Sequence, residues 1–285
     1  MRVKRSGRIR RLGLAVTAIA SILAVWGTLL EPRLLWFPAE RVVVPHLPAA
    51  QEGFTIAVLA DLHVGSPAVD LSRLRTLVEE TNRRRPDLIV IPGDLLISGV
   101  LGGSVVSPEE IAAVLTDLRA RRGVVAVLGN HDHDLGRGPA MIRALEKIGI
   151  PALENRALEL EPGLWIAGFS DLWSTTPKPE RAIQPVPANA ALIGLTHNPD
   201  VFPEVPLRVG LMIAGHTHGG QVRLPLLGAP VVPSRFGSRY LRGLITEAGH
   251  QVFVSSGVGT SILPVRLGVP PEIPILTLTS TATGP

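Results

Sequence analysis

The chain has 285 residues, of which 46% are hydrophobic, enough for one large domain or two small ones with a buried core. Its formal charge is +4, but six basic residues stand within the first eleven positions, where no acid occurs. The rest of the chain has 22 basic and 24 acidic residues. It therefore lacks the basic stripe that binding of duplex nucleic acid requires, and we expect no nucleic-acid partner. The absence of cysteine excludes disulfides and thiolate metal sites.

The N-terminal region combines a basic flank, residues 1–11, with an apolar run. Residues 12–30 carry no charge over roughly the length that a helix needs to cross the hydrocarbon core of a bilayer. A cleaved signal peptide and a buried core helix are the alternatives. The run exceeds the usual apolar core of a signal peptide, and soluble core helices rarely have such a basic flank. We therefore expect residues 12–30 to be a transmembrane anchor, a single N-terminal span that places the protein at the cell membrane.

The flanks of the span predict its orientation. The positive-inside rule keeps the N-terminus in the cytoplasm and exports the following domain, although the cytoplasmic face stays an alternative. Arg10 and Arg11 also resemble part of a twin-arginine export signal, from which Ile9 and Gly13 depart. Residues 31–52 contain four prolines and are expected to form a stiff connector rather than a folded unit.

Beyond residue 53, short β-branched runs alternate with helical patterns, an order typical of parallel strands joined by crossover helices. After residue 149 the pattern becomes rich in short strands and turns, with little helix between them. We expect one α/β domain over residues 53–281, with two packed sheets flanked by helices. The first strands are expected at 54–60, 87–93 and 124–129, and the helices at 71–84, 108–121 and 139–148.

Polar side chains follow many of these predicted strands at their carboxyl ends, where open α/β sheets place their ligand sites. A single Asp or Asn there is an ordinary turn former. Six of the eight histidines nevertheless lie in or beside these positions, which independent turns do not explain; His46 and His250 are expected to be structural. The strand-end residues are Asp61, His63, Asp94, Asn130, His131, Asp132, His197, His216 and His218.

These residue types predict a metal site. Imidazole, carboxylate and amide oxygen, without sulfur, suit zinc, manganese, iron, nickel or cobalt. Gly93, Gly129 and Gly215 each stand directly before a candidate ligand. We expect them to permit tight turns close to the ion, with little room for a side chain.

The blocks "DLH", "GD", "GNHD", "THNPD" and "GHTHGGQ", in this order, resemble the calcineurin-like metallophosphoesterases over about residues 54–280. The span, the segment "PSRFGSRYLRGL" and the tail "SSGVGTSILPVRLGVPPEIPILTL" resemble the membrane-associated branch of YkuE-like proteins and certain UDP-2,3-diacylglucosamine hydrolases. The resemblance implies a four-layer α/β/β/α sandwich with two divalent metal ions at the sheet edges. It assigns one metal to Asp61, His63 and His218, the other to Asn130, His197 and His216, and the bridging position to Asp94.

The implied reaction is hydrolysis of a phosphodiester or pyrophosphate, by in-line attack of hydroxide generated from a water that both metals share. The resemblance makes His131 the proton donor to the leaving oxygen. Asp132 is expected to orient His131 and to favour its charged form. A catalytically silent, metal-stabilised scaffold that binds a phosphorylated ligand or lipid is the alternative function.

UDP-2,3-diacylglucosamine, a nucleotide-lipid of lipid A biosynthesis, is the most specific substrate candidate, and it rests on the family resemblance alone. Its cytoplasmic location conflicts with the predicted export of the domain.

Four further polar residues lie near the blocks. His133 stands where many relatives have an aromatic residue and is expected to be structural, and Asp134 is expected to be a turn or helix-cap residue. Arg239 and Tyr240 are candidates for contact with a phosphate or a head group. The alternative for this pair is to pack and cap a β-hairpin.

Overall fold

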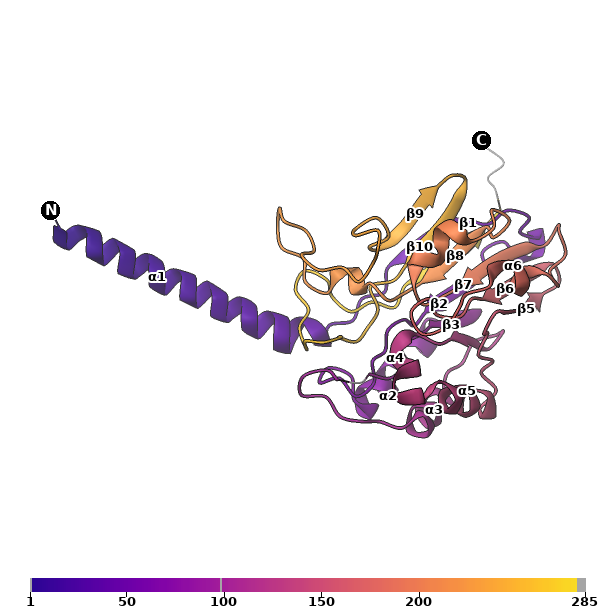
Figure 1. Ribbon diagram of the computed structural model, residues 1–285, viewed down its shortest axis with the longest axis horizontal. Helices are drawn as coiled ribbons and strands as arrows, with labels where there is room; N and C mark the ends of the chain where they lie inside the picture. The colour runs from indigo at the N-terminus through magenta and orange to yellow at the C-terminus, as the bar shows by residue number, and fades with distance from the viewer. Residues whose placement is uncertain (1, 98, 281–285) are drawn as a thin grey trace.

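The computed structural model describes residues 2–97 and 99–280, in which two sheets lie face to face between helices (Figure 1). The strand order of the first sheet is β1-β11-β2-β3-β4, and that of the second is β5-β6-β7-β8-β10-β9. The strands of the first sheet are β1 (Ala39–Val43), β2 (Thr55–Val58), β3 (Leu88–Pro92), β4 (Val124–Val127) and β11 (Ile275–Thr279). Those of the second are β5 (Arg156–Glu161), β6 (Leu164–Gly168), β7 (Ala191–Leu195), β8 (Leu211–Ala214), β9 (Gly243–Glu247) and β10 (His250–Val254).

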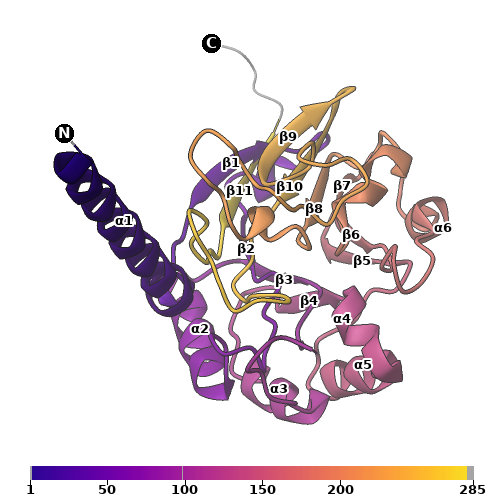
Figure 2. The same cartoon turned by 60° about the vertical axis from the view of Figure 1, so that its left-hand side comes forward.

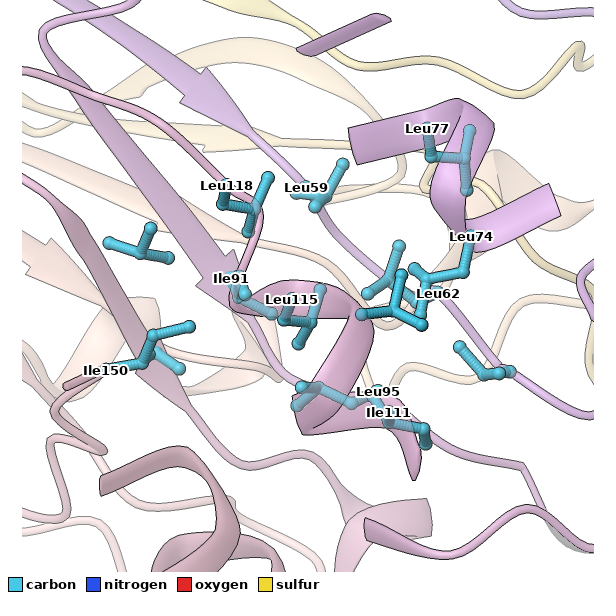
Figure 3. Packing of buried hydrophobic residues seen from close by; sticks show 14 of the residues in the cluster. Leu59, Leu62, Leu74, Leu77, Ile91, Leu95, Ile111, Leu115, Leu118 and Ile150 are labelled. Carbon is cyan, nitrogen blue, oxygen red and sulfur yellow. The ribbon is translucent and has the colours of Figure 1, made fainter. Parts of the chain in front are cut away.

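Three helices cover the outer face of the first sheet: α2 (Leu71–Arg83), α3 (Pro108–Leu115) and α5 (Gly138–Lys147). Asp70 caps α2 by accepting a hydrogen bond from the backbone N–H of Arg73, at 2.7 Å. Figure 3 shows leucine and isoleucine side chains of α2 and α3 gathered against the strands, as the apolar faces of these helices predict.

Helix α3 ends earlier than the predicted range of 108–121. The side-chain amide of Asn82, on α2, donates to the carbonyl oxygen of Asp117 at 2.8 Å and accepts from the backbone N–H of Arg119 at 2.7 Å. These backbone groups therefore bond to a neighbouring helix instead of continuing α3, so the prediction was too long by about one and a half turns.

The facing sheets share a core, and the alternation along β2 shows how each strand divides its side chains. Ile56 and Val58 point into the core between the sheets, while Ala57 lies in the core beneath the helices. A third core lies between the second sheet and the short helix α6 (Pro179–Ile183) with the 3-10 helix η5 (Pro199–Glu204). The order of layers is therefore α/β/β/α, as expected from the sequence.

The predicted connector, residues 31–52, contributes to the fold, so the expectation of an unfolded connector is wrong for these residues. Strand β1 pairs in parallel with β11 at the edge of the first sheet, and its Val42 is fully buried. Pro38 and Pro45 stand just outside β1, where the missing N–H of proline removes no ladder hydrogen bond. Prolines that suggested a stiff linker thus delimit an edge strand.

The N-terminal helix α1 (Arg2–Val25) projects from the body and continues through η1 (Trp26–Leu30) and η2 (Glu31–Arg33) (Figures 1 and 2). Residues 10–33 are long and apolar enough to cross a membrane, and nearly all of their side chains are exposed. The base of this helix contacts the body directly. The backbone N–H of Arg266 donates to the carbonyl oxygen of Gly27 at 2.8 Å, and that of Val269 donates to the buried carboxylate of Glu31 at 2.6 Å.

Candidate metal centre and active site

All seven predicted metal ligands lie together where the carboxyl ends of strands from both sheets meet. The first sheet presents the residues that follow β2, β3 and β4, and the second presents those that follow β7 and β8. Parallel strands expose their carboxyl ends at one edge, and the stacking of the two sheets brings these edges together. The residues are Asp61, His63, Asp94 and Asn130 from the first sheet and His197, His216 and His218 from the second.

Asp61, His63 and His218 form the first ligand group. One ligand atom from each lies within 4.8 Å of the others, and all three side chains are buried. The Nε2 atoms of His63 and His218 face each other at 2.9 Å. Among the described residues, Nδ1 of His63 has no hydrogen-bond partner. Two imidazole nitrogens aimed at one point beside a carboxylate are suited to hold a divalent cation.

Asn130, His197 and His216 form the second ligand group. Nε2 of His197 lies 3.1 Å from Oδ1 of Asn130 and 3.0 Å from Nδ1 of His216. Nδ1 of His197 faces the carbonyl oxygen of Pro92 at 2.9 Å. Donation to this carbonyl leaves Nε2 free to bind a metal, which is how metal-binding histidines are usually oriented.

Asp94 lies between the two groups. Its Oδ2 atom is 3.5 Å from Nε2 of His63 in the first group and 3.3 Å from Nε2 of His197 in the second. A carboxylate in this position can contact two cations and reduce the repulsion between them. The donor set and its two-part arrangement therefore fit a pair of divalent metal ions.

The charges in the centre show which ligands hold protons before a metal binds. Burial raises the pKa of Asp61 to about 7 and lowers the pKa values of His63 and His216 to about 3. Burial alone also lowers the pKa of His197, but the adjacent Asp94 carboxylate outweighs it and raises that pKa to about 10. At neutral pH, His63 and His216 are therefore uncharged ligands, whereas His197 must lose a proton to bind a metal.

Five of the seven ligands have a backbone φ in the left-handed region, which is uncommon for residues other than glycine. Such conformations each cost of order 1–3 kcal/mol and persist only where the surrounding structure enforces them. Their concentration at one sheet edge indicates that ligand geometry takes precedence there over local backbone preference. The φ angles are 48° for Asp61, 45° for His63, 53° for Asp94, 73° for His216 and 52° for His218.

The three glycines before the ligands have no room for a side chain, in agreement with the sequence expectation. A Cβ atom on Gly93 would lie 2.6 Å from the backbone nitrogen of Gly129 and 2.8 Å from Nδ1 of His197. A Cβ atom on Gly215 would lie 2.5 Å from Oδ2 of Asp61, and one on Gly129 would collide with Asp94. The backbone therefore passes directly beneath the ligands.

His131 lies beside the metal ligands on the short helix α4 (Asn130–His133), with its backbone N–H donating to Oδ1 of Asp94 at 2.9 Å. Its Nε2 atom is 3.4 Å from the hydroxyl of Ser261, and its Nδ1 atom is 3.0 Å from Oδ2 of Asp134. The carboxylate that contacts the ring of His131 is thus that of Asp134, a residue expected from the sequence to be only a turn or cap residue.

Asp132 does not orient His131, so this expectation is wrong. Its fully buried carboxylate accepts hydrogen bonds from the backbone N–H groups of Leu95 at 2.9 Å, Leu96 at 3.1 Å and Gly129 at 2.9 Å. Burial, followed by the nearby Asp94 charge, raises the pKa of Asp132 to about 7. On a helical turn, successive side chains point in different directions, so the neighbour of His131 turns away while the residue three positions later returns to it.

Comparison with known proteins decides the family. Residues 54–220 match the calcineurin-like phosphoesterase family. The chain belongs to this family. It is 31% identical to the metallophosphoesterase YkuE of Bacillus subtilis, over 88% of each chain. It is 33% identical to the phosphodiesterase YaeI of Escherichia coli, over 85% of this chain and 88% of that protein. It is 28% identical to a zebrafish (Danio rerio) transmembrane protein with a metallophosphoesterase domain, over 94% of this chain and 62% of that protein.

Calcineurin-like phosphoesterases use divalent metal ions, and this member has the Asp and His clusters to bind them. The chain is accordingly a phosphoester hydrolase of the metal-dependent class.

Arg239 and Tyr240 of this phosphoesterase contact Glu247 and do not line the cavity beside the metal centre, so their expected contact with substrate is not supported. The guanidinium of Arg239 donates to both oxygens of Glu247, at 2.8 Å each, and the buried Tyr240 donates to the same carboxylate at 2.9 Å. Burial and this hydrogen bond raise the pKa of Tyr240 to about 12. Since Glu247 ends β9, the pair holds a β-hairpin in place, which was the alternative interpretation.

The metal centre opens into a cavity of about 560 Å³. Asp94, Asn130, His131, His216 and His218 line one end of it, while much of the remaining wall consists of proline and aliphatic side chains. The ring of His133 is absent from this lining and lies instead against Gly138, at the start of α5.

Further aromatic and polar residues that line the cavity were not among the predicted site residues: Trp173, Thr217, Gln221 and Ser261. The ring of Trp173 meets that of His216 edge to face, with ring centroids 4.4 Å apart. Trp173 follows β6, so the rule that located the other strand-end residues could have indicated it. Thr217 and Gln221 belong to the block "GHTHGGQ", which could have indicated them, whereas Ser261 lies on a loop with no comparable signal.

Proposed function

We propose that this protein is a membrane-anchored, two-metal hydrolase of phosphodiesters or pyrophosphates in which His131 is the proton donor. The observation that carries the proposal is that His131, the bridging candidate Asp94 and members of both ligand groups line one cavity. The Escherichia coli relative is named a phosphodiesterase, which favours a diester over a monoester as substrate.

Each part of the centre has a distinct task in this proposal. When bound, two divalent ions polarise the phosphoryl group and make a water acidic enough to supply the nucleophile near neutral pH. Ligands from both sheets would hold the ions, and the carboxylate of Asp94, which lies between the two ligand groups, would reduce the repulsion between them. Nε2 of His131, on the cavity side, gives its proton to the leaving oxygen, while Asp134 holds the ring through Nδ1.

The proposed anchor is residues 12–30, within the segment 10–33 that is long and apolar enough to cross a membrane, and the zebrafish relative's description as a transmembrane protein supports it. The basic flank places the catalytic domain outside the cytoplasm by the positive-inside rule. UDP-2,3-diacylglucosamine stays a candidate substrate only if the domain faces the cytoplasm. A reporter enzyme active on one side of the membrane, fused to the C-terminus, distinguishes the two orientations.

The activity is tested with manganese-loaded full-length protein and two diesters, bis(p-nitrophenyl) phosphate and diphenyl phosphate. His131→Ala should slow hydrolysis of diphenyl phosphate by about 10²-fold or more, because phenolate needs a proton more than p-nitrophenolate does. The loss on bis(p-nitrophenyl) phosphate should be smaller. His133→Ala, the matched control, should change neither rate, and metal content should be the same in all three proteins.

Failure of the wild-type protein to hydrolyse any diester or pyrophosphate across manganese, zinc and iron would refute the proposal. Such a protein, with its metals bound, would favour the alternative of a silent scaffold. Equal losses on both diesters in His131→Ala would leave hydrolysis in place but remove the proton-donor role.

A further inference from the structure

The base of the N-terminal helix fixes how the cavity lies relative to the apolar run. Gly27 belongs to residues 12–30, yet its carbonyl oxygen accepts a hydrogen bond from Arg266, and a Cβ on Gly27 would lie 3.2 Å from the side chain of Val265. With residues 12–30 in the bilayer, the segment around Val265 must lie at the bilayer surface. Trp26 and Trp36, both exposed near this base, are residues that prefer the membrane–water interface.

Exposed apolar side chains lie on the segment that makes this contact and on two loops bonded to it. We define the apolar rim as Leu101, Leu226, Leu227, Ile262 and Leu263, all of them exposed. Backbone hydrogen bonds join its parts: the N–H of Leu101 donates to the carbonyl of Ile262 at 3.2 Å, and that of Arg223 donates to the carbonyl of Leu267 at 2.7 Å. Both views show the yellow segment after β10 beside the base of α1 (Figures 1 and 2).

Hydrogen bonds from one side chain hold the part of the rim around Ile262 in this exposed position. The side chain of Gln221 donates to the carbonyls of Ser261 at 3.1 Å and Leu263 at 3.0 Å, and accepts from the N–H of Ser261 at 2.8 Å. Ile262, at the tip, is 74% exposed and has a φ of 64°, a conformation that disfavours β-branched residues. A glycine or asparagine would suit the turn better, so folding alone does not account for an isoleucine there.

The rim continues into the cavity. Ile262, Leu263 and Val265 line the same cavity as Asp94 and His131, so an apolar wall runs from the metal centre to the base of the helix. We propose that this wall accepts the apolar tail of a phosphoester that resides in the membrane, and that the apolar rim lies in the bilayer interface to admit it. The proposal rests on the proposed function and names its substrate class: amphiphiles with a phosphodiester or pyrophosphate head.

The attachment of the N-terminal helix to the body favours the lipid bilayer, rather than another protein, as the partner of the apolar rim. The segment that carries Ile262 and Leu263 also contacts the apolar run at Gly27, so a second protein chain docked on the rim would have to enter the same interface. Burial of exposed aliphatic side chains in a bilayer is favourable roughly in proportion to their apolar area.

The position of the rim is tested independently of catalysis. Because the chain has no cysteine, Ile262→Cys and Leu207→Cys each provide a single labelling site in the full-length protein. Leu207 is also exposed but precedes β8, at the sheet edge opposite His216. An environment-sensitive fluorophore at residue 262 should shift to shorter wavelength in vesicles and be quenched by nitroxide-bearing lipids, whereas one at residue 207 should do neither.

Equal responses at residues 262 and 207 would overturn the membrane position of the rim. A shift at residue 262 that needs no lipid and grows with protein concentration would assign the surface to a second copy of the chain, and would also overturn it.

The substrate class is tested with two diesters that share a leaving group, ethyl and hexadecyl p-nitrophenyl phosphate. In both, water adds to phosphorus and the bond to p-nitrophenolate breaks. The manganese-loaded protein is placed in vesicles of a phosphate-free glycolipid. We expect kcat/KM for the hexadecyl ester to exceed that for the ethyl ester by about tenfold or more, since the tail gains apolar contacts.

The double variant Ile262→Ser/Leu263→Ser should lower the hexadecyl-to-ethyl ratio by about tenfold, while Leu207→Ser should leave the ratio unchanged. The variant Leu226→Ser/Leu227→Ser provides a second test, outside the cavity lining, should the first variant fold poorly. Equal hydrolysis of the two esters by the wild type, or a ratio insensitive to the rim, would overturn the proposal. Hydrolysis of neither ester would refute the proposed function itself.

Discussion

The carboxylate of Asp134 lies 3.0 Å from Nδ1 of His131, while Nε2 of the same ring, on the cavity side, lies 3.4 Å from the hydroxyl of Ser261. The imidazole is thus held from one end and presented to the cavity by the other. Asp134 stands three positions after His131, the spacing at which side chains on a helical turn meet.

Asp134→Asn should reduce kcat by about tenfold, with metal content and KM near those of the wild type, because the ring of His131 loses its charged partner. Asp117→Asn is a suitable control, since Asp117 is an exposed aspartate at the far end of α3. Steady-state kinetics with diphenyl phosphate measure the effect. An unchanged kcat would show that Asp134 does not position His131.

Asp132→Ala should act on stability. Three buried backbone N–H groups would lose their acceptor, and each such loss costs about 1–3 kcal/mol where water cannot replace it. We expect the free energy of unfolding of the metal-free protein to fall by about 2–4 kcal/mol, as urea denaturation would measure. A variant as stable as the wild type, but inactive with metals bound, would indicate instead that Asp132 has a direct role in catalysis.

Gly93→Ala should displace the second ligand group. Its φ is 84°, and the added Cβ would meet both the backbone of Gly129 and the ring of His197. Gly249→Ala separates the effect of the positive φ from the effect of these contacts, because Gly249 has a φ of 87° with nothing within 4 Å of the added Cβ. Both variants should lose about 1 kcal/mol of stability to the strained alanine, and Gly93→Ala should lose more because of its two close contacts. Only Gly93→Ala should also lower the bound metal, as elemental analysis of the purified proteins can show.

Metal binding should release protons in a pH-dependent way. Below pH 7 Asp61 holds a proton, because its pKa is raised to about 7, and His197 holds one throughout because its pKa is raised to about 10. His63 and His216 release none above pH 5, because their pKa values are lowered to about 3. Loading both metals should release about two protons at pH 6 and about one at pH 8.5.

Affinity for the metals should consequently rise with pH across this range. Calorimetric titrations in buffers of different ionisation enthalpy count the protons. Uptake of metal without proton release at pH 6 would contradict the assigned charges.

The sequence predicted the metal centre better than its surroundings, for a physical reason. Ligands that follow buried strands inherit their positions from the sheet, so the pattern of apolar runs was enough to predict that His63 and His218 lie together across a sequence separation of 155 residues. Whether Asp132 or Asp134 contacts the ring of His131 depends on how the side chains point around a four-residue helix. A helix this short has no periodic sequence pattern from which these directions could be predicted.

Other features depend on contacts between distant segments. The side chain that ends α3 early belongs to Asn82 on another helix, and the pairing of β1 with β11 joins segments more than 200 residues apart. Such long-range contacts override local pattern.

The two ligand groups each draw side chains from both halves of the chain. His63 faces His218, and Asn130 faces His197, so each pair reaches from the first sheet to the second. Bound metals would therefore act as two noncovalent cross-links at one edge of the sandwich. A chelator should loosen that edge first, exposing the strand ends to hydrogen exchange while the helix-covered core remains protected.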